Sequence, residues 1–338
     1  MARRAPTLAQ IASAAGVSAM TASRALAGQP GVSAELRSEL RRLADEMGYE
    51  TNRVARKLVS GSSRVIGVLA SGLDTPFVAA LVTAIARAGA AAGHDVLIDA
   101  VIDYERRPAG SVMQLLQQFT DGVIAVLPYE HGFVQTLSRA RIPVMTIDHP
   151  RAHAEFPSVA ADSYGGARAA MAHLAALGHR RIAFIGGAAQ LESSHERRRA
   201  YDDAVAVLSL ARDATLVLDG DYTLEGGRRA GERLLKLRKR PTAVFAANDL
   251  SAFGAMAVLQ QGGLRIPTDI SIVGFDDIPA AAQWHPSLTT VRQPVEELGR
   301  ATVQTLLALI AGLHAATPQL ILPTELVVRE SSGRVATR

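Results

Sequence analysis

The chain has 338 residues, 48% of them hydrophobic, which excludes a disordered chain and predicts two or three domains. It contains no cysteine, so disulfide frameworks, thiolate zinc sites, iron–sulfur clusters and cysteine nucleophiles are all excluded. The basic start lacks an apolar h-region, and no run reaches 18 uncharged apolar residues. We therefore expect a soluble, cytoplasmic protein without membrane association.

The positive charge is concentrated at the amino end. Residues 1–64 contain ten Lys or Arg and five Asp or Glu, a net charge of +5. Subtracting these from the totals of 36 and 32 leaves 26 basic and 27 acidic residues over 65–338, a net charge of −1. A small basic module beside a near-neutral body is typical of a protein that binds a polyanion. A solvated helical face would give the same excess of positive charge. The local sequence pattern must therefore distinguish it from a polyanion-binding module.

That local pattern predicts short helices joined by a glycine turn. Thr7 and Gln10 form a capping box at the start of an apolar stripe with helical spacing. Gly16 ends this first helix, and Ser18 caps a second helix over 19–26. With a third helix over about 34–47, the segment has the pattern of a helix-turn-helix.

The start of the second helix of such a motif enters the major groove of DNA. Arg24 can bond O6 and N7 of a guanine, and Thr21 and Ser23 suit phosphate contacts. Ala19 and Met20 can only pack on thymine methyls or base edges. Packing of Met20 in the core of the domain is the alternative, which its position on the outward face disfavours.

These segments resemble the DNA-binding head of the lactose/galactose repressor family. The resemblance rests on residues 7–12, 16–26 and 48–58, with Ala22 where the family usually has valine. It implies that Thr7, Ser18, Asn52 and Arg53 also contact DNA. It also implies that residues 51–63 are a hinge helix and linker, in which Leu58 wedges between base pairs in the minor groove. Simple linker packing is the alternative for Leu58. Residues 17–21 resemble the gluconate-responsive branch of the family.

From residue 64 onward, apolar strands alternate with amphipathic helices such as the one expected over 77–93. The expected strands are 65–69, 96–101, 122–127, 143–147, 181–185, 242–246 and 271–274. This alternation predicts parallel sheets covered by helices on both faces, and seven strands predict two lobes with a cleft between them. The predicted fold is α/β: an all-α helix-turn-helix head over 1–50, and a two-lobed, doubly wound parallel-sheet core over 64–338. The core resembles type I periplasmic binding proteins.

Ligands of such sheets bind beyond the carboxyl ends of the strands. Ser71, Asp148, Asn248 and Asp276 follow strands there, and their acceptors and amides suit a hydroxyl-rich ligand. The family resemblance continues through the body and implies one set of effector ligands: Asp148, Arg197, Asn248, Asp276 and Gln293, with Tyr222 as an aromatic platform. Because Ala200 replaces a family glycine, Arg198 and Arg199 stay alternatives to Arg197. Helix capping is the alternative role for Asn248 and Asp276.

The motifs of the common nucleotide-dependent enzymes, serine hydrolases and zinc proteases do not occur in the chain, so we predict no enzyme, cofactor or metal site. We interpret the protein as a homodimeric repressor of a carbohydrate-utilisation operon that binds a palindromic operator. Its effector is a sugar, a sugar acid or a phosphosugar, since arginine also binds carboxylate and phosphate. The alternatives are a two-lobed sugar-binding protein, which the basic head disfavours, and a regulator with a nucleobase corepressor.

Overall fold

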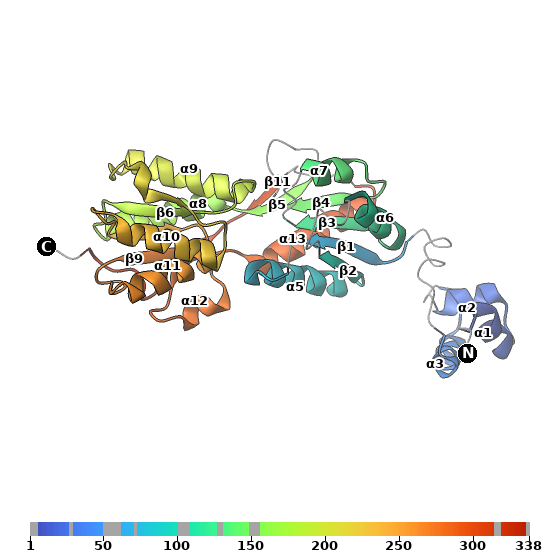
Figure 1. Ribbon diagram of the computed structural model, residues 1–338. Coiled ribbons are helices and arrows are strands. Elements are labelled where there is room, and N and C mark those ends of the chain that lie inside the picture. The colour runs from blue at the N-terminus through green and yellow to red at the C-terminus, as the bar shows by residue number, and fades with distance from the viewer. Residues whose placement is uncertain are drawn as a thin grey trace. The chain divides into compact units, whose positions relative to one another are not determined.

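The computed structural model describes residues 6–26, 30–49, 62–70, 73–100, 109–126, 131–148, 156–313 and 319–335. The chain divides into two compact units, Met1–Ser63 and Arg64–Arg338, which are described separately (Figure 1).

The first unit contains three helices: α1 (Leu8–Ala14), α2 (Ala19–Leu26) and α3 (Ala34–Met47). The capping box is confirmed, because the amide of Thr7 donates to Gln10 Oε1 at 2.8 Å and the amide of Gln10 donates to Thr7 Oγ1. The amide of Thr21 donates to Ser18 Oγ at 3.0 Å, as expected of a cap. Ile11, Leu40 and alanines including Ala22 form a small buried core. Local capping and three apolar faces therefore produce the predicted helix-turn-helix.

The second unit consists of two lobes, each built on one sheet. The first-lobe sheet has the order β11-β5-β4-β3-β1-β2, and all of its neighbours are parallel. Its strands are β1 (Val65–Ala70), β2 (Asp95–Ala100), β3 (Gly122–Val126), β4 (Val144–Ile147), β5 (Ser158–Ala161) and β11 (Gln319–Leu322). The lobe's helices are α5 (Pro76–Ala91), α6 (Ala109–Phe119), α7 (His131–Ser138) and α13 (Val295–Ile310). Apolar clusters lie on both faces of this sheet, as predicted for buried parallel strands.

The second-lobe sheet has the order β12-β10-β9-β8-β6-β7. Its strands are β6 (Ile182–Gly186), β7 (Val217–Asp219), β8 (Ala243–Ala246), β9 (Ser271–Asp276), β10 (Thr289–Arg292) and β12 (Glu325–Val327). Its helices are α8 (Ser163–Ala176), α9 (Glu192–Val207), α10 (Leu224–Lys236), α11 (Asp249–Gln261) and α12 (Pro279–Gln283), besides the short 3₁₀ helix Ala214–Leu216. β12 pairs antiparallel with β10, so the expectation of purely parallel sheets is wrong at this edge.

The seven strands predicted from the sequence are present, with ends that differ by at most two residues. The sequence does not predict five further strands: β5, β7, β10, β11 and β12. Each has only three or four residues, and most are incompletely buried or lie at the edge of a sheet. The helix expected over 77–93 is α5, which begins with Pro76 at its first turn.

The chain crosses between the lobes three times, at Asp162, at Gln293–Pro294 and between β11 and β12 (Figure 1). The first and third crossings are hydrogen bonded to each other. The amide of Asp162 donates to the carbonyl oxygen of Leu322 at 2.7 Å, and Thr324 Oγ1 donates to the Asp162 carbonyl oxygen at 3.1 Å. The lobes are therefore joined by a short hinge rather than by one linker.

Candidate functional site

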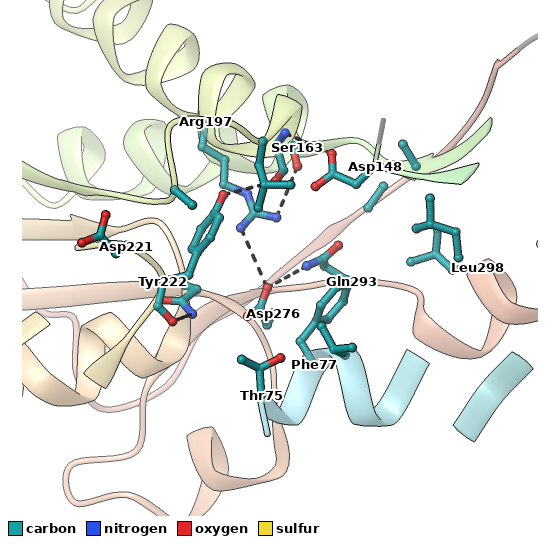
Figure 2. Close-up of a pocket in the computed structure, with 18 of the residues that line it drawn as sticks. Thr75, Phe77, Asp148, Ser163, Arg197, Asp221, Tyr222, Asp276, Gln293 and Leu298 are labelled. Carbon is teal, nitrogen blue, oxygen red and sulfur yellow. Dashed lines mark hydrogen bonds and ion pairs between the residues drawn. The ribbon is translucent and has the colours of Figure 1, made fainter. Parts of the chain in front are cut away.

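A cavity of about 250 Å³ lies between the two lobes, where strands β4, β8 and β9 end. Figure 2 shows side chains from both lobes converging on it. Of the predicted effector residues, all six that the structure describes line this cavity: Asp148, Arg197, Tyr222, Asn248, Asp276 and Gln293. Ser71 lies outside the described residues. What the six residues bind stays a prediction.

The guanidinium group of Arg197 is buried at the centre of the cavity wall. Its Nη1 donates to the carbonyl oxygen of Ala247 at 2.6 Å, and its Nη2 donates to Ser163 Oγ at 3.3 Å. It also lies 3.6 Å from the ring centre of Phe275, a cation–π contact. Its Nε is buried without a hydrogen-bond partner among the described residues. A ligand oxygen that reached this N–H would remove an unfavourable unpaired donor.

The neighbouring arginines have a different role. Arg198 and Arg199 are exposed, and they pair with Asp202 and Glu196 along α9. The ambiguity that Ala200 leaves in the sequence is therefore resolved: Arg197 is the arginine that faces the cavity.

Asp276 ends β9 on the cavity wall. Its Oδ1 accepts a hydrogen bond from Gln293 Nε2 at 2.7 Å and lies 3.9 Å from Arg197 Nη1. Burial raises the pKa of Asp276 to about 6, although Arg197 and the bond from Gln293 both act to lower it. This carboxyl group can therefore change its protonation state near neutral pH.

Asp148 connects the two lobes across the cavity. It follows β4 of the first lobe, and its Oδ1 accepts a hydrogen bond from the amide of Ser193 on α9 at 3.0 Å. The Ser193 hydroxyl lies 3.2 Å from the Tyr222 hydroxyl. Burial raises the pKa of Asp148, while the hydrogen bonds from Ser193 and the charge of Arg197 lower it.

Asn248 caps α11, the alternative role considered for it. Its Oδ1 accepts from the amide of Ser251 at 3.0 Å, and its Nδ2 donates to the carbonyl oxygen of Tyr222 at 2.9 Å. Its amide group therefore fixes both the start of a helix and the loop that carries Tyr222. Asn248 still lines the cavity.

Backbone strain is concentrated around the cavity. Asp148, Asp221, Tyr222 and Asp276 have positive φ angles and line it, and Asp277 follows directly. Non-glycine residues adopt this conformation rarely, and such strain is often found at functional sites. The strain supports assigning function to this cavity.

The two walls of the cavity differ in character. The second-lobe wall is polar and carries Arg197, Ser193, Asn248 and Asp276. The first-lobe wall is mostly apolar; besides Thr75 and Asp148 it presents Phe77, Val78, Ile147, Ala160, Ala161 and Leu298. A ligand held here meets hydrogen-bonding groups on one side and an apolar surface on the other.

Sequence reasoning missed several of these residues. Thr75 and Phe77 begin the helix after β1, so the rule about strand ends could have found them. Ser163 and Leu298 gave no signal, because each follows a crossing between the lobes and reaches the cavity only through the fold. Ser193 is identified by its contacts with Asp148 and Tyr222 in the folded structure.

In the first unit, the predicted DNA-contacting residues of α2 differ in exposure, and Thr21 and Ser23 are half-buried. Met20 is 73% exposed, which rules out the alternative of core packing, and Ala19 and Arg24 are exposed as well. Arg24 Nη2 donates to the carbonyl oxygen of Pro30 at 2.8 Å. Asn52, Arg53 and Leu58 lie outside the described residues.

The described residues contain neither a candidate metal site nor a membrane-spanning helix. No three His, Asp or Glu side chains are grouped so that they could hold a metal ion. No helix is long and apolar enough to cross a bilayer.

Comparisons with known proteins match both units. A family model described as "Bacterial regulatory proteins, lacI family" matches residues 7–52, and one for a periplasmic binding protein-like domain matches residues 171–332. The HTH-type transcriptional regulator CelR of Thermobifida fusca is 34% identical over 97% of this chain and 99% of its own length. A solved complex of CelR with cellobiose is 31% identical and covers 96% of this chain and 99% of that one, with a TM-score of 0.75. The lac repressor dimer bound to operator and the anti-inducer ONPF is 30% identical over 98% of this chain and 100% of that one, with a TM-score of 0.86.

Proposed function

The chain belongs to the lacI family of bacterial regulatory proteins and is a DNA-binding transcriptional regulator, and we propose that a small molecule in the cavity between its lobes controls its affinity for DNA. Residues 1–50 are the DNA-binding head, 51–63 the hinge, and 64–338 the effector-binding and dimerisation core. The observation that carries this proposal is that the six predicted effector residues within the described part of the chain line one cavity. As a regulator of transcription, the protein acts in the cytoplasm and needs no catalytic residue.

We propose that the protein binds DNA as a homodimer on a palindromic operator, because a helix-turn-helix dimer reads two symmetric half-sites. The exposure of Met20 and Arg24 on α2 supports DNA binding by this helix. The lac repressor structure, a dimer on its operator, provides the precedent. The regulated genes serve carbohydrate use, by analogy with relatives such as CelR, which was solved with cellobiose.

The charges of the cavity favour an uncharged effector. Arg197 is the single cation among the described residues that line it, and each of its two Nη atoms already donates one hydrogen bond, to Ala247 and to Ser163. Asp148, Asp221 and Asp276 line the same cavity. A carboxylate or phosphate on the ligand would meet this excess of acidic groups, at a cost that grows in a partly buried site. We therefore favour a neutral, hydroxyl-rich ligand over the sugar acid or phosphosugar.

The apolar first-lobe wall refines this choice. Hydroxyl groups of the ligand bond to the second-lobe wall, and a hydrocarbon or ring face packs on Phe77 and Leu298. A neutral glycoside or oligosaccharide has both features. A nucleoside is the second candidate, because the aromatic side chains of Phe77 and Tyr222 both line the cavity and suit a planar base.

Isothermal titration calorimetry on the full chain tests the proposal. Cellobiose, methyl and phenyl glucosides, gluconate, glucose 6-phosphate and cytidine would be titrated into the wild-type protein and the Phe77→Ala variant. We expect a neutral ligand to bind more tightly than either anion. We also expect Phe77→Ala to weaken binding of the phenyl glucoside more than binding of the methyl glucoside. Tighter binding of gluconate or the phosphate would contradict the assignment of a neutral effector.

A further inference from the structure

Exposed cations gather at one edge of the second-lobe sheet. Strands β6, β8 and β9 are parallel, so all three begin at this edge, opposite the carboxyl ends that form the cavity. The segments around these strand starts carry six exposed basic side chains, which we call the basic patch: Arg180, Arg212, Arg238, Lys239, Arg240 and Arg334.

The fold brings these cations together from separate parts of the chain. The amide of Ala211 donates to the carbonyl oxygen of Arg180 at 2.7 Å, which joins the first two segments. Arg181 Nε donates to the carbonyl oxygen of Lys239 at 3.1 Å, which joins the third. The segment with Arg334 is held at the start of β9, where the amide of Gly333 donates to Ser271 Oγ at 3.0 Å. The patch is therefore a feature of the folded lobe and not only a basic run in the sequence.

The nearby acidic groups do not neutralise the patch. Asp213 accepts a hydrogen bond from Arg181 at 2.6 Å, and hydrogen bonds from Thr215 and Arg181 lower its pKa to about 2. Asp269 pairs with Arg265 at 2.9 Å. None of the six patch cations forms an ion pair with another described residue. Since residues 65–338 carry a net charge of −1, this is a local concentration of positive charge on a near-neutral body.

The chemistry of the patch fits a phosphate backbone. Five of the six cations are arginines, whose planar guanidinium groups bind phosphate oxygens in a bidentate manner. No exposed aromatic side chain lies among the described residues of these segments, whereas protein interfaces usually rely on buried aromatic anchors. Contacts of this kind position a duplex without reading its bases.

We propose that the basic patch binds the backbone of a second DNA segment, apart from the duplex held by the head. This inference rests on the proposed function, since the polyanion available to a DNA-bound regulator is DNA itself. The patch lies at the opposite edge of its sheet from the cavity, so an effector in the cavity leaves it uncovered.

Duplex binding by the full chain tests the inference. Binding isotherms for a fluorescent random-sequence 30-base-pair duplex, resolved into the head's site and a second site, would be measured across a range of salt concentrations for the wild type and Arg238→Glu/Arg240→Glu. Each phosphate contact contributes about 0.9 to the slope of log K against log salt concentration. We expect the double variant to reduce the slope for the second site by about two and to weaken that site at low salt at least tenfold, with the head's site unchanged. Hydrogen exchange should show protection of residues 236–242 by the duplex in the wild type.

A matched control separates the patch from total charge. Arg139→Glu/Arg141→Glu makes the same change in net charge at exposed positions of the first lobe. We expect this control to keep the wild-type slope, and circular dichroism should show both variants folded.

The outcomes distinguish this inference from the proposed function. Equal slopes for the wild type and both variants, with residues 236–242 unprotected, would overturn the patch as a DNA contact and leave the head's DNA binding intact. A wild-type chain that binds no duplex would overturn the DNA-binding function and the patch together. Val207 and Leu208 are exposed apolar side chains shortly before Arg212. They favour a competing interpretation, in which the patch binds a protein or a membrane. If the variant lost binding to polyglutamate or phosphatidylglycerol vesicles but kept the duplex slope, that interpretation would replace ours.

Discussion

The side-chain amide of Gln293 donates to Asp276 Oδ1 at 2.7 Å, which connects a crossing between the lobes directly to the cavity wall (Figure 2). Gln293 follows β10 of the second lobe and precedes α13, which packs on the first lobe. Asp276 in turn lies 3.9 Å from Arg197. A ligand that engages Asp276 or Arg197 is therefore linked to the hinge through one side-chain contact. If the lobes can open and close about this hinge, such a ligand can bind one arrangement of the lobes more tightly than the other.

Replacement of Arg197 by alanine should abolish the response to effector. A charge-assisted hydrogen bond contributes about 1.5–3 kcal/mol, so its loss weakens effector binding about ten- to a hundredfold. Operator affinity without effector should stay at the wild-type value, because the head is a separate compact unit. Operator binding with and without effector measures this. Arg198→Ala, on the exposed face of the same helix, is the control. A wild-type response in Arg197→Ala would remove this residue from the switch.

The raised pKa of Asp276 predicts a dependence of stability on pH. Its folded-state pKa of about 6 exceeds the usual 3.8, so between these values the folded protein keeps a proton that the unfolded chain has released. Stability should therefore fall as pH rises through this window, and Asp276→Asn should remove that component. Urea midpoints at several pH values between 4 and 7 would show it.

Burial also raises the pKa of Asp148 and Asp249. Asp148 titrates in both proteins, whereas the charge of Asp276 is one cause of the raised pKa of Asp249. The difference between the two curves therefore reports Asp276 together with its effect on Asp249. Parallel curves would contradict the prediction.

Replacement of Arg24 should relax operator specificity at one symmetric position. A bidentate contact with guanine contributes about 1–3 kcal/mol of discrimination, and alanine loses it entirely. Arg24→Lys keeps the charge but not the paired donors, so it should retain salt-dependent affinity and lose base preference. Selection from a randomised half-site library measures the preference. An unchanged preference in Arg24→Ala would show that Arg24 reads no base.

A stability prediction concerns the close packing of α10 on α11. A Cβ atom at Gly254 would overlap the carbonyl oxygen of Leu224, which belongs to the helix backbone and cannot rotate away. Gly254→Ala should therefore destabilise the protein by about 1–3 kcal/mol, the usual cost of overpacking. Gly110 in α6 is the matched control, because a Cβ there meets no atom within 4 Å. Gly110→Ala should stabilise slightly through helix propensity. Urea unfolding compares the two, and equal effects would refute the packing argument.

The head and the strand ends were predictable because their signals are local. Thr7, Gln10 and Ser18 cap helices through contacts three residues apart, and the structure contains these contacts. Asp148 and Asp276 follow apolar strands directly, so the rule about carboxyl ends located them.

Other features depend on distant segments. Arg197 could not be separated from Arg198 and Arg199 until Phe275 and Ala247, far along the chain, were seen to surround it. The apolar wall at Leu298 comes from α13, which lies after the whole second lobe in sequence. The short strands β11 and β12 acquire their pairing only from β5 and β10.

The three crossings between the lobes have a consequence for biosynthesis. β5 at residues 158–161 pairs with β11 at 319–322, and α13 covers the first lobe from positions 295–310. A ribosome working from the amino end therefore completes the second lobe's β6–β9 before it supplies the final strand of the first. Until then, one side of β5 is an unpaired strand edge, which is prone to aggregation. A nascent chain stopped after residue 313 would lack β11 as well as β12, so a late stop codon damages the lobe that was translated first.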